Sequence, residues 1–407
     1  MLNWVNRFSI FCLLDNRQYH FSEPAFECLL GAGCKEKIEC NAGNAFEELR
    51  RFHDEHKCWM MGHLGYGLKD EIENLTSGHD DKIGFADLHF FIPETVIRLT
   101  EKEVTISDEH AEIIFDEIIS IAPPANGHPP SVNTIQSRIS KQDYIDTVKK
   151  LQQHILRGDC YEINFCQDFF SEGAVIEPIV VYEQLTQISP NPFSSLYKQE
   201  NKYCICASPE RYLKKEGDRI FSQPMKGTAR RDIANEQNDQ NAISYLKQSS
   251  KEKSENVMVV DLVRNDLSRV CKEGSVKVDE LFGVYSFPQV HQMISTVSGE
   301  LRTDVHFVDA IKATFPMGSM TGAPKKKVME LIEQYESVKR GLFSGAIGYI
   351  SPDADFDFNV VIRSIFYNED SNYLSFQAGS AITFYCNAEQ EYEECLLKAD
   401  AIMKALA

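Results

Sequence analysis

The order of helix-like and strand-like segments is the feature that most limits the fold of this chain. Apolar residues recur at helical spacing in "SKQDYIDTVKKLQQHILRGDC", where Ser140 is a suitable N-cap and Gly158 a suitable terminator. The same test predicts helices at about 235–256, 323–336 and 388–406. Strand-like runs occur at "YCICAS", "VMVVDLV", "FSGAIGYIS", "FNVVIRSIF" and "YLSFQAG". Because helices and strands do not alternate strictly, the sequence favours an α+β fold over a doubly wound α/β sheet.

A proline-rich segment, "APPANGHPPSVNT" at residues 122–134, divides the chain. Proline prevents regular strand pairing, so this segment is predicted to be an irregular crossover. Upstream, strand-like runs such as "VIRLTEKEVTI" and "ADLHFFIPE" indicate a smaller N-terminal region over 1–121. Downstream, residues 135–407 are predicted to form a longer and more helical unit.

The charge balance excludes some classes of partner. Asp and Glu number 61 against 42 Lys and Arg in 407 residues, a formal net charge of -19. Such a chain repels phosphate backbones, so we expect no nucleic-acid partner, although local cations or a bound metal can still hold an anionic substrate. The apolar run from Phe8 to Leu14 is too short to span a membrane, which predicts a cytoplasmic protein with no membrane partner. Twelve cysteines without a Cys-x-x-Cys spacing predict neither a zinc knuckle nor a redox pair.

Two pairs of glutamates have a spacing that suits metal binding. Glu391 and Glu394 lie three residues apart in the last predicted helix, and Glu252 and Glu255 repeat this spacing near the end of another. Each pair alone could be an ordinary solvated helix face. Brought together, the two pairs could bind Mg²⁺ and leave water positions for a substrate anion.

Other segments carry single residues whose role the sequence leaves open. Arg363 in "VVIRS" needs an anionic partner if it is buried, either a structural carboxylate or a substrate. Glu210 in "ASPERYL" could have the raised pKa of a general acid or could mark a turn. Lys226 in "SQPMKGTARR" could be a solvated cation or a nucleophile. Backbone amides in "FQAGSAIT", and Thr321 in the loop "GSMTGAPKKKVMEL", could face an anionic ligand.

Taken in chain order, these segments resemble the chorismate-utilising enzymes, which include anthranilate synthase component I, aminodeoxychorismate synthase component I, and the isochorismate and salicylate synthases. The segments are "GDCYEINFCQ", "ASPERYL", "PMKGTARR", "SENVMVVDLVRNDLSRV", "GSMTGAPKKKVMELIE", "SGAIGYIS", "VVIRS", "QAGSAIT" and "EYEECLLKA". The resemblance covers roughly residues 135–407 and is weaker over 1–121. It implies an α+β fold of the anthranilate synthase component I type, with two large antiparallel β-sheets packed together and helices outside. It also implies a cleft that binds chorismate and Mg²⁺.

The resemblance further implies roles for individual residues. Glu255 and Glu394 match metal-ligating glutamates, and Glu252 and Glu391 would support them. Glu210 matches the acid that protonates the departing C4 hydroxyl. The implied substrate contacts are Arg363, Tyr349, Lys398 and the amides around Gly379 and Ser380, with Thr321 lining the cleft.

Two positions then select a branch of the family. Members that add water carry a lysine base where this sequence has Gln167, which argues against isochorismate or salicylate formation. Lys226 stands where anthranilate synthases read alanine and aminodeoxychorismate synthases read lysine. The resemblance therefore implies conversion of chorismate and ammonia to 4-amino-4-deoxychorismate, for p-aminobenzoate and folate synthesis, with ammonia from a separate glutamine amidotransferase subunit. Anthranilate synthesis, or a catalytically silent chorismate-binding subunit, are the alternatives.

The implied chemistry makes demands on Lys226 and its surroundings. Its amine would attack C2, so it must be unprotonated, and we expect desolvation in a closed site to favour that form. Where much of the family has histidine this chain has Gln292, preceded by His291, which leaves open whether an imidazole contacts the C4 hydroxyl. The segment "LLDN" at Leu13 to Asn16 departs from the motif associated with tryptophan binding, so we expect no tryptophan feedback.

Overall fold

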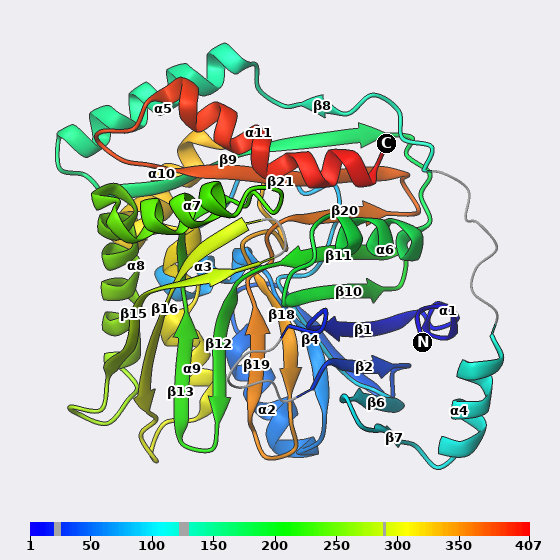
Figure 1. Ribbon diagram of the computed structural model, residues 1–407. Coiled ribbons are helices and arrows are strands. Elements are labelled where there is room, and N and C mark those ends of the chain that lie inside the picture. Colours follow the sequence, from blue (N-terminus) through cyan, green and yellow to red (C-terminus); the bar gives the residue numbers. More distant parts are fainter. Residues whose placement is uncertain (20–25, 122–129, 288–289) are drawn as a thin grey trace.

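Two large antiparallel β-sheets form the body of the molecule in this computed structural model, which describes residues 1–19, 26–121, 130–287 and 290–407 (Figure 1). The 11-stranded sheet has the order β17 (Gly322–Ala323), β9 (Glu162–Glu172), β21 (Tyr373–Ile382), β20 (Ser364–Asn368), β11 (Lys202–Ser208), β10 (Phe193–Gln199), β1 (Ile10–Asp15), β2 (Cys28–Ala32), β6 (Thr95–Leu99) and β7 (Val104–Ser107), with β8 (Gln136–Ser137) paired to β9. The 10-stranded sheet has the order β14 (Met225–Arg230), β16 (Val290–Glu300), β13 (Arg219–Gln223), β12 (Arg211–Glu216), β19 (Phe356–Asn359), β18 (Ala346–Ile350), β4 (Met60–Leu64), β5 (Leu88–Ile92) and β3 (Glu36–Cys40), with β15 (Lys277–Ser286) paired to β16.

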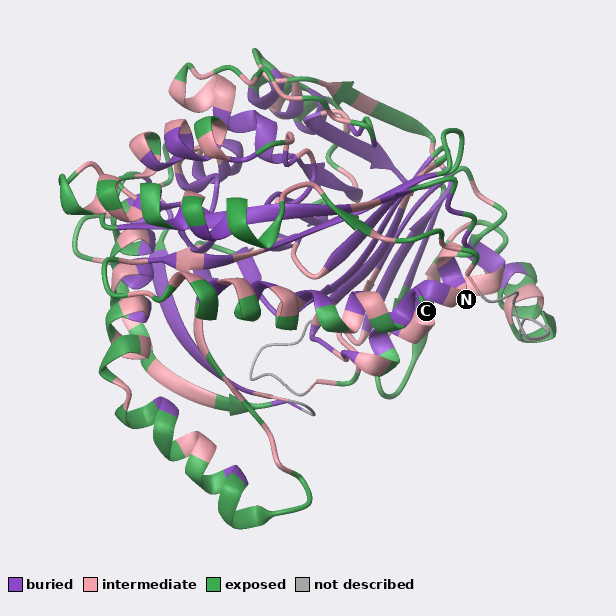
Figure 2. Ribbon diagram, turned by 90° about the horizontal axis from the view of Figure 1, so that it is seen from above, coloured by how far each residue is buried: buried purple, intermediate pink, exposed green. Residues whose placement is uncertain are grey.

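Helices connect these strands and cover the outside of the sheets (Figure 2). They are α1 (Leu2–Val5), α2 (Ala45–His56), α3 (Lys69–Glu73), α4 (Ala111–Ser120), α5 (Lys141–Leu156), α6 (Pro178–Ile188), α7 (Glu236–Gln248), α8 (Ser250–Ser268), α9 (Phe307–Thr314), α10 (Lys325–Tyr335) and α11 (Ala388–Ala405), with the 3₁₀ turns η1 (Tyr66–Leu68) and η2 (Gly318–Met320). The predicted α+β class, with two packed antiparallel sheets and outer helices, is confirmed. None of the helices in the described ranges has the length and hydropathy needed to cross a membrane.

The N-terminal region continues both sheets. Strand β1 pairs with β10, and β4 pairs with β18, so residues 1–121 supply strands to the same two sheets as the rest of the chain. Most of the proline-rich crossover, residues 122–129, lies outside the described residues. The segment 122–134 therefore divides the sequence, but both sheets contain strands from each side of it.

Side chains of β9 alternate between its two faces and so contribute to two hydrophobic cores. Ile163, Phe165 and Phe169 point into the core that α5, α6, α10 and α11 cover, together with Tyr144. Cys166, on the other face, belongs to the core between the two sheets. Because side chains of a strand alternate between faces, both cores are filled from one apolar strand.

Three of the four predicted helices occur close to their expected bounds. Ser140 caps α5 through a capping box with Asp143, and Gly158 follows the helix with φ +83°. Helices α10 and α11 fall inside the ranges predicted for them. Pro324 precedes α10 as its N-cap residue instead of standing in the first turn.

The remaining predicted helix, at about 235–256, is present but divided into two helices, and the strand "VMVVDLV" was assigned wrongly. Helix α7 ends at Gln248, and α8 begins again at Ser250, with Ser249 accepting a hydrogen bond from the amide of Glu252. Helix α8 then runs through the whole of "VMVVDLV". Its buried valines, among them Val259 and Val263, are four residues apart, so tertiary packing of one helical face overrides the strand preference of β-branched residues.

Arg363 does not lie within a strand as predicted. Strand β19 ends at Asn359 in the 10-stranded sheet, and β20 begins at Ser364 in the 11-stranded sheet. The apolar run continues because the chain crosses between the sheets inside the core, with Arg363 in the left-handed region at φ +52°. The connection between the sheets, and not a strand, positions its side chain.

Candidate active site

Lys226 is one half of a buried ion pair. Its Nζ donates to Oε1 of Glu162 at 2.9 Å, and the two side chains are only 11% and 5% exposed. Lys226 comes from β14 at one edge of its sheet, and Glu162 is the first residue of β9 in the other sheet. The solvated-cation reading of Lys226 is therefore excluded, and the pair marks a place where the two sheets meet.

The protonation state of Lys226 differs from the sequence-based expectation. Burial by itself lowers the pKa of Lys226, but the carboxylates of Glu162, Glu255 and Glu394 outweigh burial and raise it above its ordinary value. In the protein without ligands the amine is therefore protonated. Desolvation alone does not supply the neutral nucleophile, which needs a proton acceptor or a change in the surrounding charge.

Glu210 is buried in the turn between β11 and β12. Its amide donates to Ser208 Oγ at 3.2 Å, and its carbonyl accepts the amide of Val360 at 3.0 Å. Burial raises the pKa of Glu210 to about 7, although the nearby cations Lys226 and Arg363 act in the opposite direction. A carboxyl with that pKa carries its proton in an appreciable fraction of molecules at neutral pH, as a general acid requires.

The two acidic pairs, on α8 and α11, lie opposite each other. Lys251 stands between them, with Nζ 3.8 Å from Oε1 of Glu255 and 3.8 Å from Oε1 of Glu391. Burial raises the pKa of Glu255 to about 7 and also raises the pKa values of Glu252 and Glu391. The pairs are therefore not two separate solvated helix faces, because they share one cation and one region of high negative charge.

Lys398 joins α11 to the end of β21. Its Nζ donates to the carbonyl of Gly379 at 2.9 Å and lies 2.8 Å from Oε1 of Glu394. Burial acts to raise the pKa of Glu394, but the ammonium groups of Lys398 and Lys251 outweigh it and hold the pKa below its ordinary value. Glu394 is thus ionised at neutral pH and close to the backbone of the predicted anion-binding strand end.

The guanidinium of Arg363 has no hydrogen bond or ion pair within the described part of the chain, where Glu210 is the charged group that acts on it. Burial lowers its pKa to about 10, while the charge of Glu210 acts in the opposite direction. A guanidinium in such surroundings calls for an anionic partner. Of the two roles left open by the sequence, a substrate carboxylate fits this geometry better than a structural ion pair.

We call this group of side chains the Lys226 cluster. It comprises six carboxylates and four cations, namely Glu162, Glu210, Glu252, Glu255, Glu391, Glu394, Lys226, Lys251, Lys398 and Arg363. Carboxylate oxygen donors in excess over cations suit a hard divalent ion such as Mg²⁺. Glu255 and Glu394 would hold it, and Glu252 and Glu391 lie beside them.

Gln167 does not take the place that the sequence analysis gave it. Its side chain lies on the other face of β9, where Oε1 accepts from Ser137 Oγ at 3.0 Å and Nε2 lies 3.3 Å from Cys395 Sγ. Glu162 is the residue of this strand that reaches Lys226. The matching of the base position to Gln167 was therefore wrong, because the five-residue step from Glu162 reverses the face to which the side chain points.

Tyr349 lies apart from the Lys226 cluster. Its ring packs against Phe26 and Trp59, and the charged groups around it are Asp357 and Arg211, which pair with each other at 2.9 Å. The prediction that Tyr349 contacts the substrate is therefore wrong, because β18 turns its side chain into a separate cavity. That cavity is also lined by Leu14, Asp15 and Asn16 of the "LLDN" segment. The absence of tryptophan feedback remains a prediction.

Thr321 and Ser380 use their hydroxyl groups within the fold. Thr321 Oγ1 donates to the carbonyl of Met317 at 3.1 Å, and its own carbonyl accepts the amide of Asn164 at 2.8 Å. Ser380 Oγ shares a hydrogen bond of 3.0 Å with the hydroxyl of Tyr144 on the helix-covered face. The predicted contacts of Thr321 and of the backbone at Ser380 with a substrate stay predictions.

Glu162 and Lys251 are members of the cluster that were not predicted from the sequence. The available signal was a glutamate that opens the apolar strand "EINFC", and a lysine directly before the first acidic pair. The structure also separates His291 from Gln292. His291 bonds to Asp239 and Ser286, at 2.9 and 2.8 Å, whereas Gln292 Oε1 is buried without a partner among the residues described.

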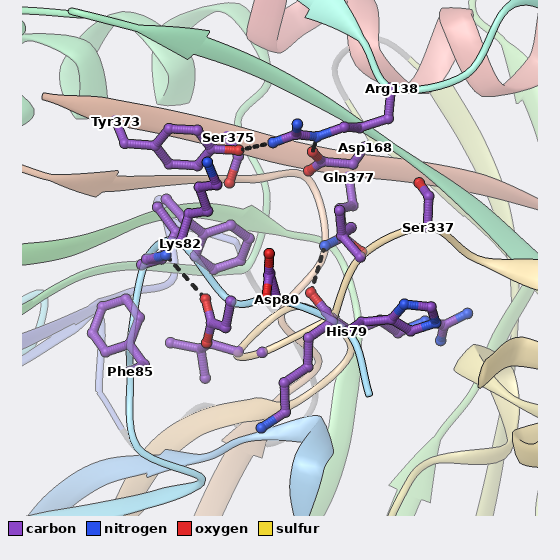
Figure 3. A pocket seen from close by; sticks show the side chains of 18 of the residues that line it. His79, Asp80, Lys82, Phe85, Arg138, Asp168, Ser337, Tyr373, Ser375 and Gln377 are labelled. Carbon is purple, nitrogen blue, oxygen red and sulfur yellow. Dashed lines mark hydrogen bonds and ion pairs between the residues drawn. The ribbon is translucent and has the colours of Figure 1, made fainter. Parts of the chain in front are cut away.

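A cavity larger than the one beside Tyr349 lies away from the Lys226 cluster. It has a volume of about 300 Å³ and is lined by the loops 78–85 and 337–342 and by β9, β20 and β21 (Figure 3). Figure 3 shows Arg138 at its rim, bonded to Asp168 at 3.1 Å and to Tyr373. Burial raises the pKa of Asp168 to about 7. No residue of the Lys226 cluster lines this cavity.

Comparison with known proteins places the chain in a family. A sequence profile described as chorismate binding enzyme matches residues 11–404. Aminodeoxychorismate synthase component 1 of Escherichia coli is 32% identical over 367 residues, which cover 88% of this chain and 80% of that protein. The chloroplastic aminodeoxychorismate synthase of Arabidopsis thaliana is 33% identical over 371 residues, covering 85% of this chain but 40% of its own length. The chain thus spans about two fifths of the plant relatives, and 76% and 80% of the aminodeoxychorismate synthase component 1 proteins of Bacillus subtilis and Escherichia coli.

Anthranilate synthases are similar to a comparable degree. Component 1 from Acetivibrio thermocellus is 32% identical over 371 residues, covering 85% of this chain and 74% of that protein. The crystal structure of anthranilate synthase component I from Streptococcus pneumoniae TIGR4 has a TM-score of 0.82 and 25% identity, and covers 94% of this chain and 93% of that one. The fold and the buried acidic cluster define a chorismate-binding protein class. This chain belongs to the chorismate binding enzyme family.

Proposed function

We propose that this chain is the aminating component of an aminodeoxychorismate synthase, which converts chorismate and ammonia to 4-amino-4-deoxychorismate and water. The observation that carries the proposal is the buried amine of Lys226, paired with Glu162 and surrounded by the acidic pairs. Relatives named aminodeoxychorismate synthase component 1 in Bacillus subtilis and Escherichia coli, at 30% and 32% identity, support this branch.

In this proposal chorismate binds to charged side chains whose partners within the described residues are few or lacking. Arg363 is positioned by the connection between the sheets and takes one carboxylate, and Lys398 with the Gly379 backbone lies at the end of β21 near the other. A bound Mg²⁺, held by Glu255 and Glu394, would neutralise the ring carboxylate and withdraw charge from it. Within the described residues the buried Oε1 of Gln292 has no partner, and we assign it the role of accepting a hydrogen bond from a substrate hydroxyl.

The first chemical step forms a bond between Lys226 and the substrate. Glu162, in direct hydrogen-bond contact, accepts a proton from the Lys226 ammonium. The neutral amine attacks C2, the double bond shifts, and the C4–oxygen bond breaks as Glu210 donates its proton to the departing hydroxyl. This step yields water, an ionised Glu210 and a secondary ammonium that joins Nζ to C2.

The second step restores the ring. Ammonia attacks C4, the double bond shifts back, and the bond between Nζ and C2 breaks, which releases Lys226 as a neutral amine. The new C4 ammonium returns a proton to Glu210, so both groups are ready for another cycle. Two allylic shifts therefore place nitrogen at the carbon that lost the hydroxyl, which explains why an amine is needed in the protein.

The source of ammonia and the place in metabolism belong to the same proposal. The component 1 names of the bacterial relatives imply a second component, and we infer that a separate glutamine amidotransferase subunit supplies ammonia. The product would then be consumed in p-aminobenzoate and folate synthesis.

The experiment supplies purified protein with chorismate, Mg²⁺ and ammonium, and identifies the product by mass spectrometry. We expect 4-amino-4-deoxychorismate. Formation of anthranilate would contradict the proposal and support the second candidate, anthranilate synthesis, which the 32% identity to the Acetivibrio thermocellus enzyme favours. Absence of turnover with either ammonium or a glutaminase-coupled supply would support a silent chorismate-binding subunit.

A further inference from the structure

His53 has a buried imidazole whose two ring nitrogens lack hydrogen-bond partners among the described residues. It lies on α2 with 4% exposure. The ring of Phe307 packs edge-on against it, with centroids 4.7 Å apart and an interplanar angle of 75°. Buried polar atoms are nearly always hydrogen-bonded, so both ring nitrogens of His53 are available to a further partner.

The side chains of two further residues, Asp54 and His306, lie close to His53. Asp54 follows it on α2, and His306 is the N-cap residue of α9. Oδ1 of Asp54 lies 3.7 Å from Nδ1 of His53 and 3.6 Å from Nε2 of His306. One ligand atom from each of the three residues lies within 4.8 Å of the others. Ligand atoms in a tetrahedral zinc site are about 3.4 Å apart, so small side-chain rotations would complete the geometry.

We propose that His53, Asp54 and His306 form a binding site for a divalent transition metal ion of the zinc type, which joins α2 to α9. Two imidazole nitrogens and one carboxylate suit Zn²⁺, Co²⁺ or Ni²⁺, whereas Mg²⁺ prefers oxygen donors alone. The site opens to solvent, because the side chains of Asp54 and His306 are 55% and 24% exposed. The fourth position of the ion is therefore accessible to water.

Metal binding would change one local hydrogen bond. Nδ1 of His306 accepts the amide of Val308 at 3.2 Å, so its proton is on Nε2 in the neutral ring. A metal on Nε2 moves that proton to Nδ1 and exchanges the cap bond for a metal bond. The gain is a direct link between two helices on the outside of the 10-stranded sheet, so the expected effect is on stability.

The site shares no residue with the Lys226 cluster, and its test does not depend on catalytic activity. The chelator-treated full chain is titrated with ZnCl₂ by calorimetry in excess Mg²⁺, and the same sample is titrated with Co²⁺ and followed by visible absorption. The variants are Asp54→Asn and His306→Gln, and the control is His110→Gln, an exposed histidine at the start of α4.

We expect saturable binding of one Zn²⁺ per chain that raises the melting temperature, and a Co²⁺ spectrum without thiolate charge-transfer absorption. Each of the two variants should bind Zn²⁺ at least about tenfold more weakly, while His110→Gln binds as the unaltered chain does. Equal Zn²⁺ binding by Asp54→Asn and His306→Gln would overturn the proposal. So would a thiolate band, which would assign the metal to partly exposed cysteines such as Cys34 or Cys58, or the absence of binding.

Discussion

Two groups of charged side chains lie along β9, one fully buried and one partly exposed, and they differ in whether all of their members have partners. Arg340 donates to Glu336 at 2.6 and 2.8 Å, to the carbonyls of Met320 and Asn164, and to Ser344 Oγ. Glu336 also accepts the amide of Cys166 at 2.9 Å. In this pair, which we call the Arg340 pair, the donors of the guanidinium all have partners.

The Lys226 cluster, by contrast, is left incomplete. Arg363 lacks a partner within the described residues, and the pKa of Glu255 is raised to about 7 by burial. Carboxylates outnumber cations, and such an arrangement costs stability unless a ligand completes it. The comparison teaches that a buried ion pair is structural when all of its donors and acceptors have partners. Charged groups that lack partners instead indicate a site that a substrate and a metal can complete.

The largest effect is expected for Lys226→Ala. Loss of the amine should lower the rate of 4-amino-4-deoxychorismate formation by on the order of 10³-fold or more, because covalent catalysis has no substitute in the cluster. The measurement is kcat with ammonium as nitrogen source, with near-ultraviolet circular dichroism to verify folding. The matched control is Lys247→Ala, an exposed lysine on α7, which should keep full activity. Undiminished turnover in Lys226→Ala would remove the covalent role.

The Arg340 pair should respond in stability. Glu336→Gln leaves the guanidinium uncompensated and is expected to cost about 3–5 kcal/mol in the free energy of unfolding, measured with urea. The control is Glu330→Gln, which breaks an exposed pair with Lys327 on α10 and should cost at most about 1 kcal/mol. If the two variants lose the same stability, the distinction between a structural pair and a surface pair fails.

The pH dependence should distinguish Glu210 from the structural charges. Its pKa is raised to about 7 by burial, and the proposed acid must be protonated. Activity is therefore present below the pKa and lost as pH rises, so kcat/KM should fall about tenfold per pH unit above pH ~7. Glu210→Gln should lower the rate by about 10²-fold and remove this limb. An unchanged alkaline limb in Glu210→Gln would assign the titration to another group.

The smallest effect concerns Lys251, which lies between the acidic pairs at 3.8 Å from each. Lys251→Met removes a positive charge from the place where a cation would bind, so the Mg²⁺ dissociation constant should fall several-fold. Calorimetric titration with MgCl₂ measures the change, and Lys253→Met on the same helix provides the control. Weaker Mg²⁺ binding in Lys251→Met would show that the lysine supports the metal instead of competing with it.

Much of the fold and part of the site could be predicted from the sequence. Helical spacing and caps gave α5, α10 and α11, because those signals are local. The i, i+3 spacing left Glu252, Glu255, Glu391 and Glu394 open as a metal site, and the apolar strand left Glu210 open as an acid, so only the resemblance to the chorismate-utilising enzymes selected these roles. Hydrophobic periodicity did not predict α8 correctly, because "VMVVDLV" is compatible both with a strand and with one buried face of a helix.

The sequence by itself determined which residue types are available for the chemistry: four paired glutamates, a lysine in "PMKGT" and an arginine in "VVIRS". Only the tertiary structure decided which of them meet. Glu162 joined Lys226, while Gln167 and Tyr349 turned away, because the face of a strand changes with each residue and the partners come from different sheets. The protonation of Lys226 was likewise decided by the tertiary structure, since burial and the carboxylates of α8, α11 and β9 act on it in opposite directions.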